Sequence, residues 1–387
     1  MTILLFFLVW ALAAIGHAAI WVHANNCLHS VRFHGWFIRL LRGACHVINA
    51  GGILAFGFFY GPVLATSGDW SSLAPPLLVY VGICIALTVS YVPLMLYRRW
   101  TRPVPAQQTA LWCSQIDTVK QLGHKPLGTG SRSLLARLPW NEIFHVDVTE
   151  RELTLPGLPA DWDGLSLLLL SDLHLCGCPA REFFETIMSR LAQQPADLLL
   201  ITGDLVDDDR HYQWLKPLLG RLRWRHGAFA VLGNHDYWFD VSLIKKELAE
   251  LQIQYVGGAW RQVHLRDHPL IVIGNESPWL GAPPDLANCP KGGFRLCLSH
   301  SPDQLAWARR NGINLMLSGH NHGGQIRIPG IGSIFVPSRF SGRYDCGLFY
   351  EDPTLLFVSR GLSGNTPVRY FCPPEVARLT LRKGTRS

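Results

Sequence analysis

Acidic and imidazole side chains with metal-ligand chemistry recur in five short motifs after residue 170. The motifs are Asp172-Leu-His174, Gly203-Asp204, Gly233-Asn234-His235-Asp236, Ser299-His300 and Gly319-His320-Asn-His322. Carboxylate, amide oxygen and imidazole ligands suit divalent transition metals such as Mn, Fe and Zn. Seven candidate ligands exceed what one metal needs, so the pattern predicts a two-metal site. The candidate ligands are Asp172, His174, Asp204, Asn234, His300, His320 and His322.

The apolar runs that precede these motifs have the length of buried strands. They cover 166–170, 197–201, 228–232, 294–298 and 314–317, and helical patterns lie between them at 182–192, 212–222, 243–251 and 302–310. Strands that alternate with helices indicate an α/β fold, in which residues beyond the carboxyl ends of strands meet in one crevice. Near the end of the chain, 326–336, 354–358 and 376–381 alternate without helices and predict a second, more antiparallel sheet.

In this order, the motifs resemble those of the calcineurin-like metallophosphoesterase superfamily. The resemblance covers residues 144–382 and is strongest at Ser171-Asp-Leu-His174, Thr202-Gly-Asp-Leu205, Gly233-Asn-His-Asp236 and Gly319-His-Asn-His-Gly-Gly-Gln325. Further strings at 153–159, 358–362 and 373–375 are similar to a membrane-associated bacterial branch. That branch includes proteins similar to YkuE and YaeI and the UDP-2,3-diacylglucosamine hydrolases of lipid A synthesis. The resemblance implies a four-layer αββα metallophosphoesterase sandwich.

The resemblance also implies a role for each motif residue. One metal is expected on Asp172, His174, Asp204 and His322, and the other on Asp204, Asn234, His300 and His320, so that Asp204 bridges the pair. A shared carboxylate and a shared hydroxide offset the repulsion between two close dications, and the electropositive site favours phosphate. The bridging hydroxide is expected to attack phosphorus in line. His235 is expected to protonate the leaving oxygen or stabilise its charge, and Asp236 to orient His235.

Several neighbouring residues have no firm role in this scheme. Asp207 could hydrogen-bond to a ligand histidine or lie on a solvated turn with Asp208, and we favour the turn. Cys176 and Cys178 are expected to be reduced loop cysteines rather than ligands. A few late arginines could contact a substrate phosphate, which suits guanidinium geometry, but the substrate-binding residues stay unassigned. These arginines are Arg327, Arg339, Arg343, Arg360 and Arg369.

The N-terminal part of the chain has the composition of a membrane protein. The 387-residue chain is only 16% charged, against roughly 25% in an ordinary soluble domain, and six of its charged residues fall within the first 100. Three apolar stretches at 3–22, 47–65 and 77–97 each approach the ~20 residues of helix that cross a bilayer. No Lys or Arg precedes the first stretch, so we favour an uncleaved span over a signal peptide.

Loop charges predict the orientation of these spans and the division of the chain. Three arginines lie between the first two spans, none lies between the second and third, and Arg98, Arg99 and Arg102 follow the third. The positive-inside rule then places the N-terminus outside and everything after residue 97 in the cytoplasm, at a bacterial inner membrane. The predicted regions are a membrane anchor (1–97), a juxtamembrane connector (98–142) and a metallophosphoesterase catalytic domain (143–387).

Together these features predict a membrane-anchored phosphoesterase or pyrophosphohydrolase. A lipid-linked substrate such as UDP-2,3-diacylglucosamine would explain the anchor, because confinement raises the local substrate concentration. The alternative is a phosphodiesterase acting on a soluble nucleotide or glycerophosphodiester. A non-catalytic scaffold is disfavoured because every motif residue is present, and a sensor or transporter because the three spans contain no charged residue. The net charge is +7, of which the first 100 residues carry +4, so the remainder gives no reason to expect a nucleic-acid partner.

Overall fold

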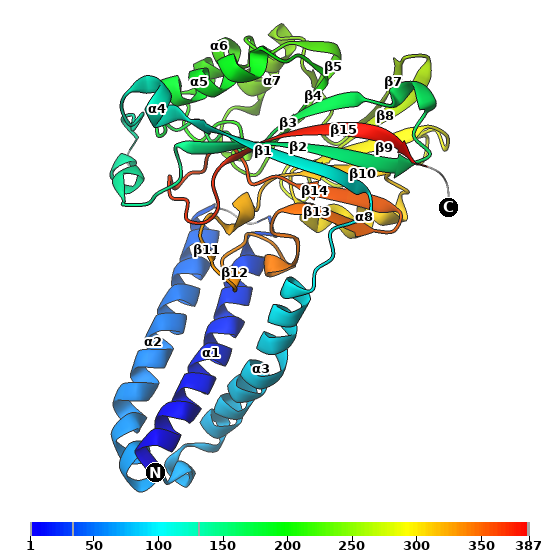
Figure 1. Cartoon of the computed structure of the whole chain (residues 1–387). Helices are drawn as coiled ribbons and strands as arrows, with labels where there is room; N and C mark the ends of the chain where they lie inside the picture. The colour runs from blue at the N-terminus through cyan, green and yellow to red at the C-terminus, as the bar shows by residue number, and fades with distance from the viewer. Residues whose placement is uncertain (1, 33–34, 131, 385–387) are drawn as a thin grey trace. The chain divides into compact units, whose positions relative to one another are not determined.

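The computed structural model describes residues 2–32, 35–130 and 132–384 (Figure 1). The chain divides into two compact units. The helical unit comprises Met1–Pro103 and Pro337–Arg343, and the sheet unit comprises Val104–Val336 and Tyr344–Ser387. The boundary at residue 103 falls inside the expected connector, and the three-part division of the chain stays a prediction.

The helical unit contains α1 (Thr2–Leu28), α2 (Gly35–Ser67) and α3 (Pro75–Trp100). Among the described residues, these are the three helices long and apolar enough to cross a membrane, and they include all three predicted stretches. Gly16 brings α1 close to α3, because a Cβ there would overlap the carbonyl oxygen of Cys84. A hydrogen bond of 2.7 Å between His17 Nδ1 and Tyr80 Oη also joins these two helices.

The first sheet of the sheet unit has the strand order β1-β2-β15-β3-β4-β5-β6. Its strands are β1 (Gln108–Asp117), β2 (His145–Pro156), β3 (Leu165–Leu170), β4 (Ala196–Thr202), β5 (Trp224–Val231), β6 (Gln254–Tyr255) and β15 (Glu375–Gly384). Strands β3 to β6 run parallel, and helices α5 (Arg181–Ala192), α6 (Leu215–Leu219) and α7 (Val241–Glu250) lie between them in the chain. This is the βαβ arrangement that the apolar runs predict.

The second sheet has the order β13-β14-β10-β9-β8-β7. Its strands are β7 (Trp260–Leu265), β8 (His268–Asn275), β9 (Phe294–Ser299), β10 (Leu315–Ser318), β13 (Gly347–Glu351) and β14 (Thr354–Val358), with α8 (Leu305–Arg310) between β9 and β10. A separate two-stranded hairpin joins β11 (Arg327–Ile328) to β12 (Gly332–Ser333).

Alternating leucines of β3 show how the layers pack. Leu167 and Leu169 belong to the core shared with Leu296 and Leu298 of β9, whereas Leu168 and Leu170 belong to the core shared with the helix α5. Successive strand side chains point to opposite faces, so the first sheet is covered by helices on one face and by the second sheet on the other. Helix α8 packs near β14. The α/β fold predicted from the sequence is confirmed.

Two expectations about secondary structure are wrong. The composition of the connector, with several prolines and a Gly-Thr-Gly-Ser run, predicts irregular structure, yet residues 108–117 form the strand β1 at the edge of the first sheet, beside β2, with many exposed side chains. It therefore lacks the apolar run by which a buried strand is recognised. The three late segments do not form one sheet either: 326–336 forms the separate hairpin β11–β12, β14 lies beside β10 in the second sheet, and β15 lies between β2 and β3 in the first. Local alternation indicates a strand but carries no information about its distant partner.

Candidate metal centre

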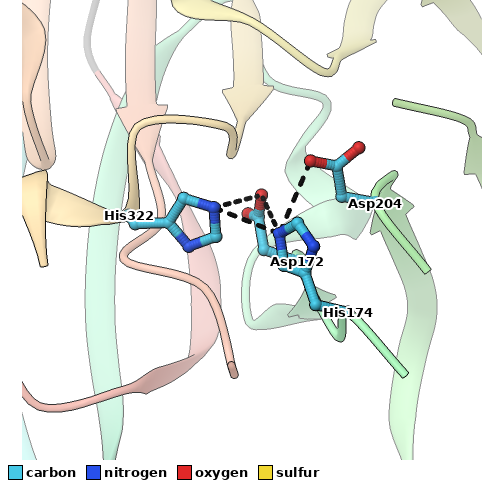
Figure 2. A group of neighbouring side chains, drawn as sticks. All are labelled: Asp172, His174, Asp204 and His322. Atoms are coloured by element: carbon cyan, nitrogen blue, oxygen red, sulfur yellow. Dashed lines mark hydrogen bonds and ion pairs between the residues drawn. The ribbon is translucent and has the colours of Figure 1, made fainter. Parts of the chain in front are cut away.

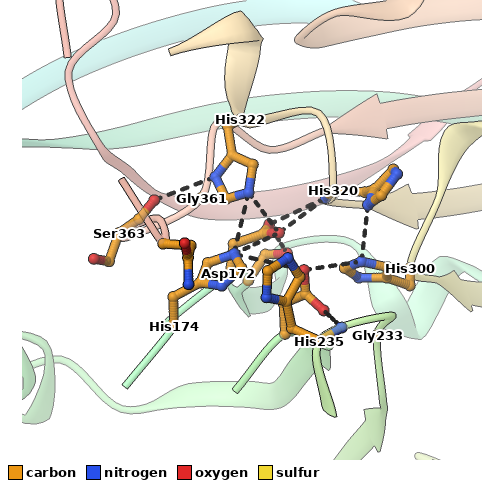
Figure 3. A network of polar contacts seen from close by, with 12 residues as sticks. Asp172, His174, Gly233, His235, His300, His320, His322, Gly361 and Ser363 are labelled. Carbon is orange, nitrogen blue, oxygen red and sulfur yellow. Dashed lines mark hydrogen bonds and ion pairs between the residues drawn. The ribbon is translucent and has the colours of Figure 1, made fainter. Parts of the chain in front are cut away.

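Strand ends from both sheets deliver the candidate ligands. Asp172 and His174 follow β3, Asp204 follows β4, and Asn234 and His235 follow β5 in the first sheet. In the second sheet, His300 follows β9, and His320 and His322 follow β10. Because these are the carboxyl ends of parallel strands, the side chains converge (Figure 3).

One cluster consists of Asp172, His174, Asp204 and His322 (Figure 2). The Nε2 atom of His174 lies 3.1 Å from Nε2 of His322 and 3.5 Å from Oδ2 of Asp204. Asp172 Oδ1 lies 3.8 Å from His174 Nε2 and 3.6 Å from His322 Nε2. These four residues are the set that the resemblance implies for the first metal.

The second cluster joins Asp204 to His300, His320 and Asn234. The Nε2 atom of His300 lies 3.3 Å from Asp204 Oδ2, 3.0 Å from Asn234 Oδ1 and 3.1 Å from Nδ1 of His320. Asp204 Oδ2 is therefore near imidazole nitrogens of both clusters, which is the position that a bridging carboxylate needs. The side chains of Asp204 and His300 are 1% and 0% exposed, so neither is solvated by bulk water.

The hydrogen-bond partners of the histidine Nδ1 atoms fit a site for divalent cations. The Nδ1 atoms of three ligands face oxygen acceptors: Asp207 for His174 at 3.0 Å, the Thr202 carbonyl for His300 at 2.7 Å and the Ser363 carbonyl for His322 at 3.2 Å. With the proton on Nδ1, each Nε2 presents a lone pair toward the other ligands. Converging lone pairs and carboxylates repel one another unless a cation lies among them, and this donor set suits transition metals.

The backbone of the ligand loops adopts uncommon conformations. Asp172, His174, Asp204, His320 and His322 all have positive φ, between 45° and 68°. Such conformations cost non-glycine residues roughly 1–2 kcal/mol each and concentrate at functional sites. Gly319 is required for the same geometry, because a Cβ there would overlap the side chains of Ser171 and Asp172.

His235 stands beside the first cluster, and a carboxylate orients it. Its Nδ1 lies 2.7 Å from Oδ1 of Asp207, and its ring meets that of His174 edge-on at 4.7 Å. Although burial opposes a charge on His235, Asp207 and Asp204 raise its pKa to about 10. Burial likewise opposes a charge on Asp207, yet His174 and His235 hold the pKa of its carboxyl well below its usual range. The pair is a cation next to an anion.

Comparison with known proteins agrees with this geometry. Residues 165–324 match the model of the calcineurin-like phosphoesterase family. Phosphodiesterase YaeI of Escherichia coli K12 is 30% identical over 224 residues, which cover 56% of this chain and 81% of YaeI. The chain belongs to the calcineurin-like phosphoesterase family.

Two further relatives of this phosphoesterase are similar over more than half of its chain. Metallophosphoesterase YkuE of Bacillus subtilis is 28% identical over 250 residues, covering 62% of this chain and 87% of YkuE. LpxG of Chlamydia trachomatis, a UDP-2,3-diacylglucosamine pyrophosphatase, is 26% identical over 304 residues, covering 62% of this chain and 92% of LpxG. The predicted family and the predicted class of enzyme, a metal-dependent phosphoric ester hydrolase, are confirmed.

Two acidic residues of the phosphoesterase, Asp207 and Asp236, make contacts other than those expected from the sequence. The solvated turn predicted for Asp207 is wrong, since its side chain is 1% exposed and contacts both His174 and His235. The orientation of His235 was assigned to Asp236, whose carboxylate instead accepts hydrogen bonds from the backbone of Leu205, Val206 and Gly233. The one available signal was spacing: Asp207 follows the candidate ligand Asp204 by three positions, across two apolar residues.

Three of the late arginines act inside the phosphoesterase fold. The Arg369 guanidinium is fully buried and donates to the carbonyls of His322 and Arg360 at 2.9 Å each. Arg360 contacts Glu375 at 3.3 Å, and Arg327 contacts Asp345 at 2.8 Å. These guanidiniums stabilise the loops next to the ligands.

The two cysteines after His174 have no ligand role in this geometry: burial raises the pKa of the Cys176 thiol to about 11 and that of the Cys178 thiol to about 12.

Proposed function

We propose that this chain is a membrane-anchored phosphoesterase that uses two divalent transition-metal ions and hydrolyses a lipid-linked phosphoester or pyrophosphate. The observation that carries the two-metal assignment is the position of Asp204 Oδ2, which lies 3.5 Å from a nitrogen of one cluster and 3.3 Å from a nitrogen of the other. One carboxylate can therefore serve both ions. Asp172, His174 and His322 would complete one site, and Asn234, His300 and His320 the other.

Each protein group has a defined task in this proposal. Bound divalent ions supply Lewis-acid chemistry, neutralising phosphoryl charge and lowering the pKa of water. His235 is the general acid: its Nδ1 is held by Asp207, which leaves Nε2 to donate a proton to the leaving oxygen. The contact of Nδ1 with the Asp207 carboxylate favours the protonated imidazole, which is the form that a general acid needs.

The membrane assignment rests on three helices of the described chain that are long and apolar enough to cross a bilayer. We place the sheet unit in the cytoplasm. Arg98, Arg99 and Arg102 lie at the end of the third span, where the chain continues into this unit, and the positive-inside rule assigns such arginine-rich ends to the cytoplasm. An anchored enzyme gains most from a substrate that also stays in the membrane. The pyrophosphatase LpxG acts, by its name, on a nucleoside diphosphate joined to a diacylated sugar, and we extend this substrate class to the present chain.

The decisive experiment is a substrate panel with the full chain in lipid nanodiscs. It compares UDP-2,3-diacylglucosamine, a nitrophenyl phosphodiester, a nucleotide diester and a glycerophosphodiester, each with Mn, Fe, Co, Ni or Zn. We expect hydrolysis of the nitrophenyl diester and the highest kcat/KM for the lipid-linked pyrophosphate. Absence of hydrolysis with every metal would contradict the enzymatic role. Preference for the nucleotide diester or the glycerophosphodiester would instead establish the soluble-substrate alternative, toward which the name of YaeI points.

A further inference from the structure

Large apolar side chains are exposed along three segments of the sheet unit. Trp140 is 87% exposed, Leu134 71% and Phe371 66%, values that leave most of each side chain in contact with solvent. Isoleucines of the β11–β12 hairpin are also exposed. We call this set the apolar rim, and its members are Leu134, Leu138, Trp140, Ile326, Ile328, Ile331 and Phe371. Large apolar side chains that are exposed on neighbouring segments are typical of an interaction site on a folded domain.

Hydrogen bonds hold the three segments side by side. The Tyr370 hydroxyl donates to the Pro139 carbonyl at 2.9 Å, next to Trp140 in the chain. The backbone N–H of Arg327 donates to the Tyr370 carbonyl at 2.9 Å, which ties the hairpin to the same residue. Asn141 Nδ2 donates to the Pro367 carbonyl at 2.8 Å. These bonds hold the segments around Pro139, Arg327 and Tyr370 next to one another, although Pro139 and Tyr370 are more than 200 positions apart in the sequence.

The same segments are joined to the metal centre. The Tyr370 N–H donates to the Gln325 carbonyl at 3.0 Å, and the Gln325 N–H donates to the carbonyl of the ligand His322 at 3.1 Å. At the other end of the rim, Arg132 Nη1 donates to Thr366 Oγ1 at 3.0 Å, and the adjacent Asn365 donates to Asp207 at 2.8 Å. The rim segments are therefore connected by hydrogen bonds to His322 and Asp207 of the site.

The chemistry of the rim fits a phospholipid surface. The segments 132–141, 326–336 and 365–371 contain no Asp or Glu, and both Arg132 and Arg137 are exposed. Tryptophan and leucine beside arginine are typical of segments that lie in the lipid headgroup layer, where basic side chains are attracted to an anionic surface. A bilayer is also the partner at the highest effective concentration, because the same chain carries three candidate spans.

We infer that the apolar rim docks on the headgroup layer of a phospholipid bilayer and seats the loops of the metal centre at the lipid surface. A substrate could then present its phosphoester to the site while its acyl chains stay in the bilayer. This consequence for substrate access rests on the proposed function, whereas the docking itself does not. Leu134, Leu138 and Trp140 supply the inserted apolar surface, and Arg137 supplies the attraction to anionic headgroups.

Fluorine NMR on the full chain tests the docking without any enzymatic readout. The protein is labelled with fluorotryptophan and placed in nanodiscs that contain an anionic phospholipid and a lipid spin-labelled near its headgroup. Trp140→Phe and Trp112→Phe assign two resonances, and Trp112, 56% exposed on β1, is the matched control. We expect the spin label to broaden the Trp140 resonance and to leave that of Trp112 sharp. Equal behaviour of the two resonances, broadened or sharp, would overturn the docking.

A second experiment tests what the docking does for catalysis. The readout is the ratio of activity on a bilayer-embedded phosphoester to activity on a water-soluble nitrophenyl diester, measured for Leu134→Ser/Trp140→Ser and for the control Leu111→Ser/Trp112→Ser. We expect the ratio to fall about tenfold for the rim variant, since two apolar anchors are lost, and to stay level for the control. An unchanged ratio in the rim variant refutes the link to substrate access. If the wild-type chain does not hydrolyse the nitrophenyl diester, the proposed function is contradicted. The NMR test of docking does not depend on this result.

Discussion

The Asp207 carboxylate lies between the rings of His174 and His235, with Oδ1 2.7 Å from Nδ1 of His235 and 3.0 Å from Nδ1 of His174. One buried side chain thus orients a candidate metal ligand and the candidate general acid together. The amide of Asn365 donates to its other oxygen at 2.8 Å. The loops after β3, β4, β5 and β14 are joined through this one carboxylate.

Replacement of Asp207 is expected to impair metal binding by His174 and proton donation by His235. Asp207→Asn preserves the shape but removes the charge that holds the two Nδ1 protons, so kcat and metal affinity should each fall about 10- to 100-fold, as for other carboxylates that orient imidazoles. Steady-state kinetics and metal titration measure the two effects. The matched control is Asp208→Asn: Asp208 pairs with the exposed Arg210 instead, and such surface pairs contribute little. Comparable losses in the two variants would refute a special role for Asp207.

Removal of the His235 imidazole should separate chemistry from metal binding. His235→Ala is expected to lower kcat about 10²- to 10⁴-fold, the usual contribution of a positioned general acid, while metal content stays at the wild-type value. His226→Ala is the control, because the two side chains are equally exposed, at 34% for His226 and 33% for His235. Kinetics and elemental analysis are read on the same samples. Loss of metal from His235→Ala would show that His235 is a ligand and not the general acid.

Metal stoichiometry should depend on which cluster is changed. Asp204→Ala removes the carboxylate that both clusters share, so the purified protein should lose both ions, whereas His300→Ala should lose one of the two. Elemental analysis after dialysis against metal-free buffer counts the ions. Asp161→Ala, in which the replaced side chain is 64% exposed, should keep the wild-type content. One ion in the wild type, or retention of one ion in Asp204→Ala, would contradict the bridging assignment.

Residue chemistry explains which parts of this site the sequence predicts. Every residue of the parallel strand β4 is buried. Its apolar run Leu198–Ile201 makes the strand recognisable in the sequence, and the polar residues that follow it are conspicuous. Which of Asp207 and Asp236 contacts the histidines depends instead on the direction in which each side chain points. The Asp236 carboxylate accepts hydrogen bonds from three backbone N–H groups. This direction depends on how the loops pack in three dimensions, which the sequence does not reveal. The partner strands of β15 could not be predicted either, because β2 and β3 lie far from it in the sequence.

A buried carboxylate outside the site should make the stability of the sheet unit depend on pH. Asp197 Oδ2 accepts hydrogen bonds from the Ser166 N–H and hydroxyl at 2.8 Å each, and Arg225 lies 3.1 Å from Oδ1. Burial opposes the charge, but these groups lower the pKa of Asp197 below its ordinary value. Asp197→Ala should therefore lower the free energy of unfolding by about 1–3 kcal/mol at neutral pH.

The sign of the pH effect follows from the lowered pKa. The stabilisation is fully present above the unfolded-state pKa of about 3.9 and is lost as the pH falls through the lower pKa of the folded state. The difference between wild type and Asp197→Ala should thus shrink in acid, as measured by denaturant titration of the full chain from neutral pH downward. Asp161→Ala should follow the wild type throughout. A difference that persists unchanged in acid would assign the loss to packing and not to the charge.

The orientation of the spans can be tested by fusing reporters to truncated chains in a bacterial host. Arg32 precedes α2, Arg39 and Arg42 lie near its N-terminal end, and Arg98 and Arg99 lie in the last turn of α3, whereas the segment between α2 and α3 contains no Lys or Arg. Since Lys and Arg are retained on the cytoplasmic side, a fluorescent protein fused after Arg102 should fluoresce, and alkaline phosphatase at the same point should be inactive. Fusions after Asp69 are the matched control and should give the reverse pattern. Active phosphatase after Arg102 would place the metal centre outside the cytoplasm and contradict the proposed orientation.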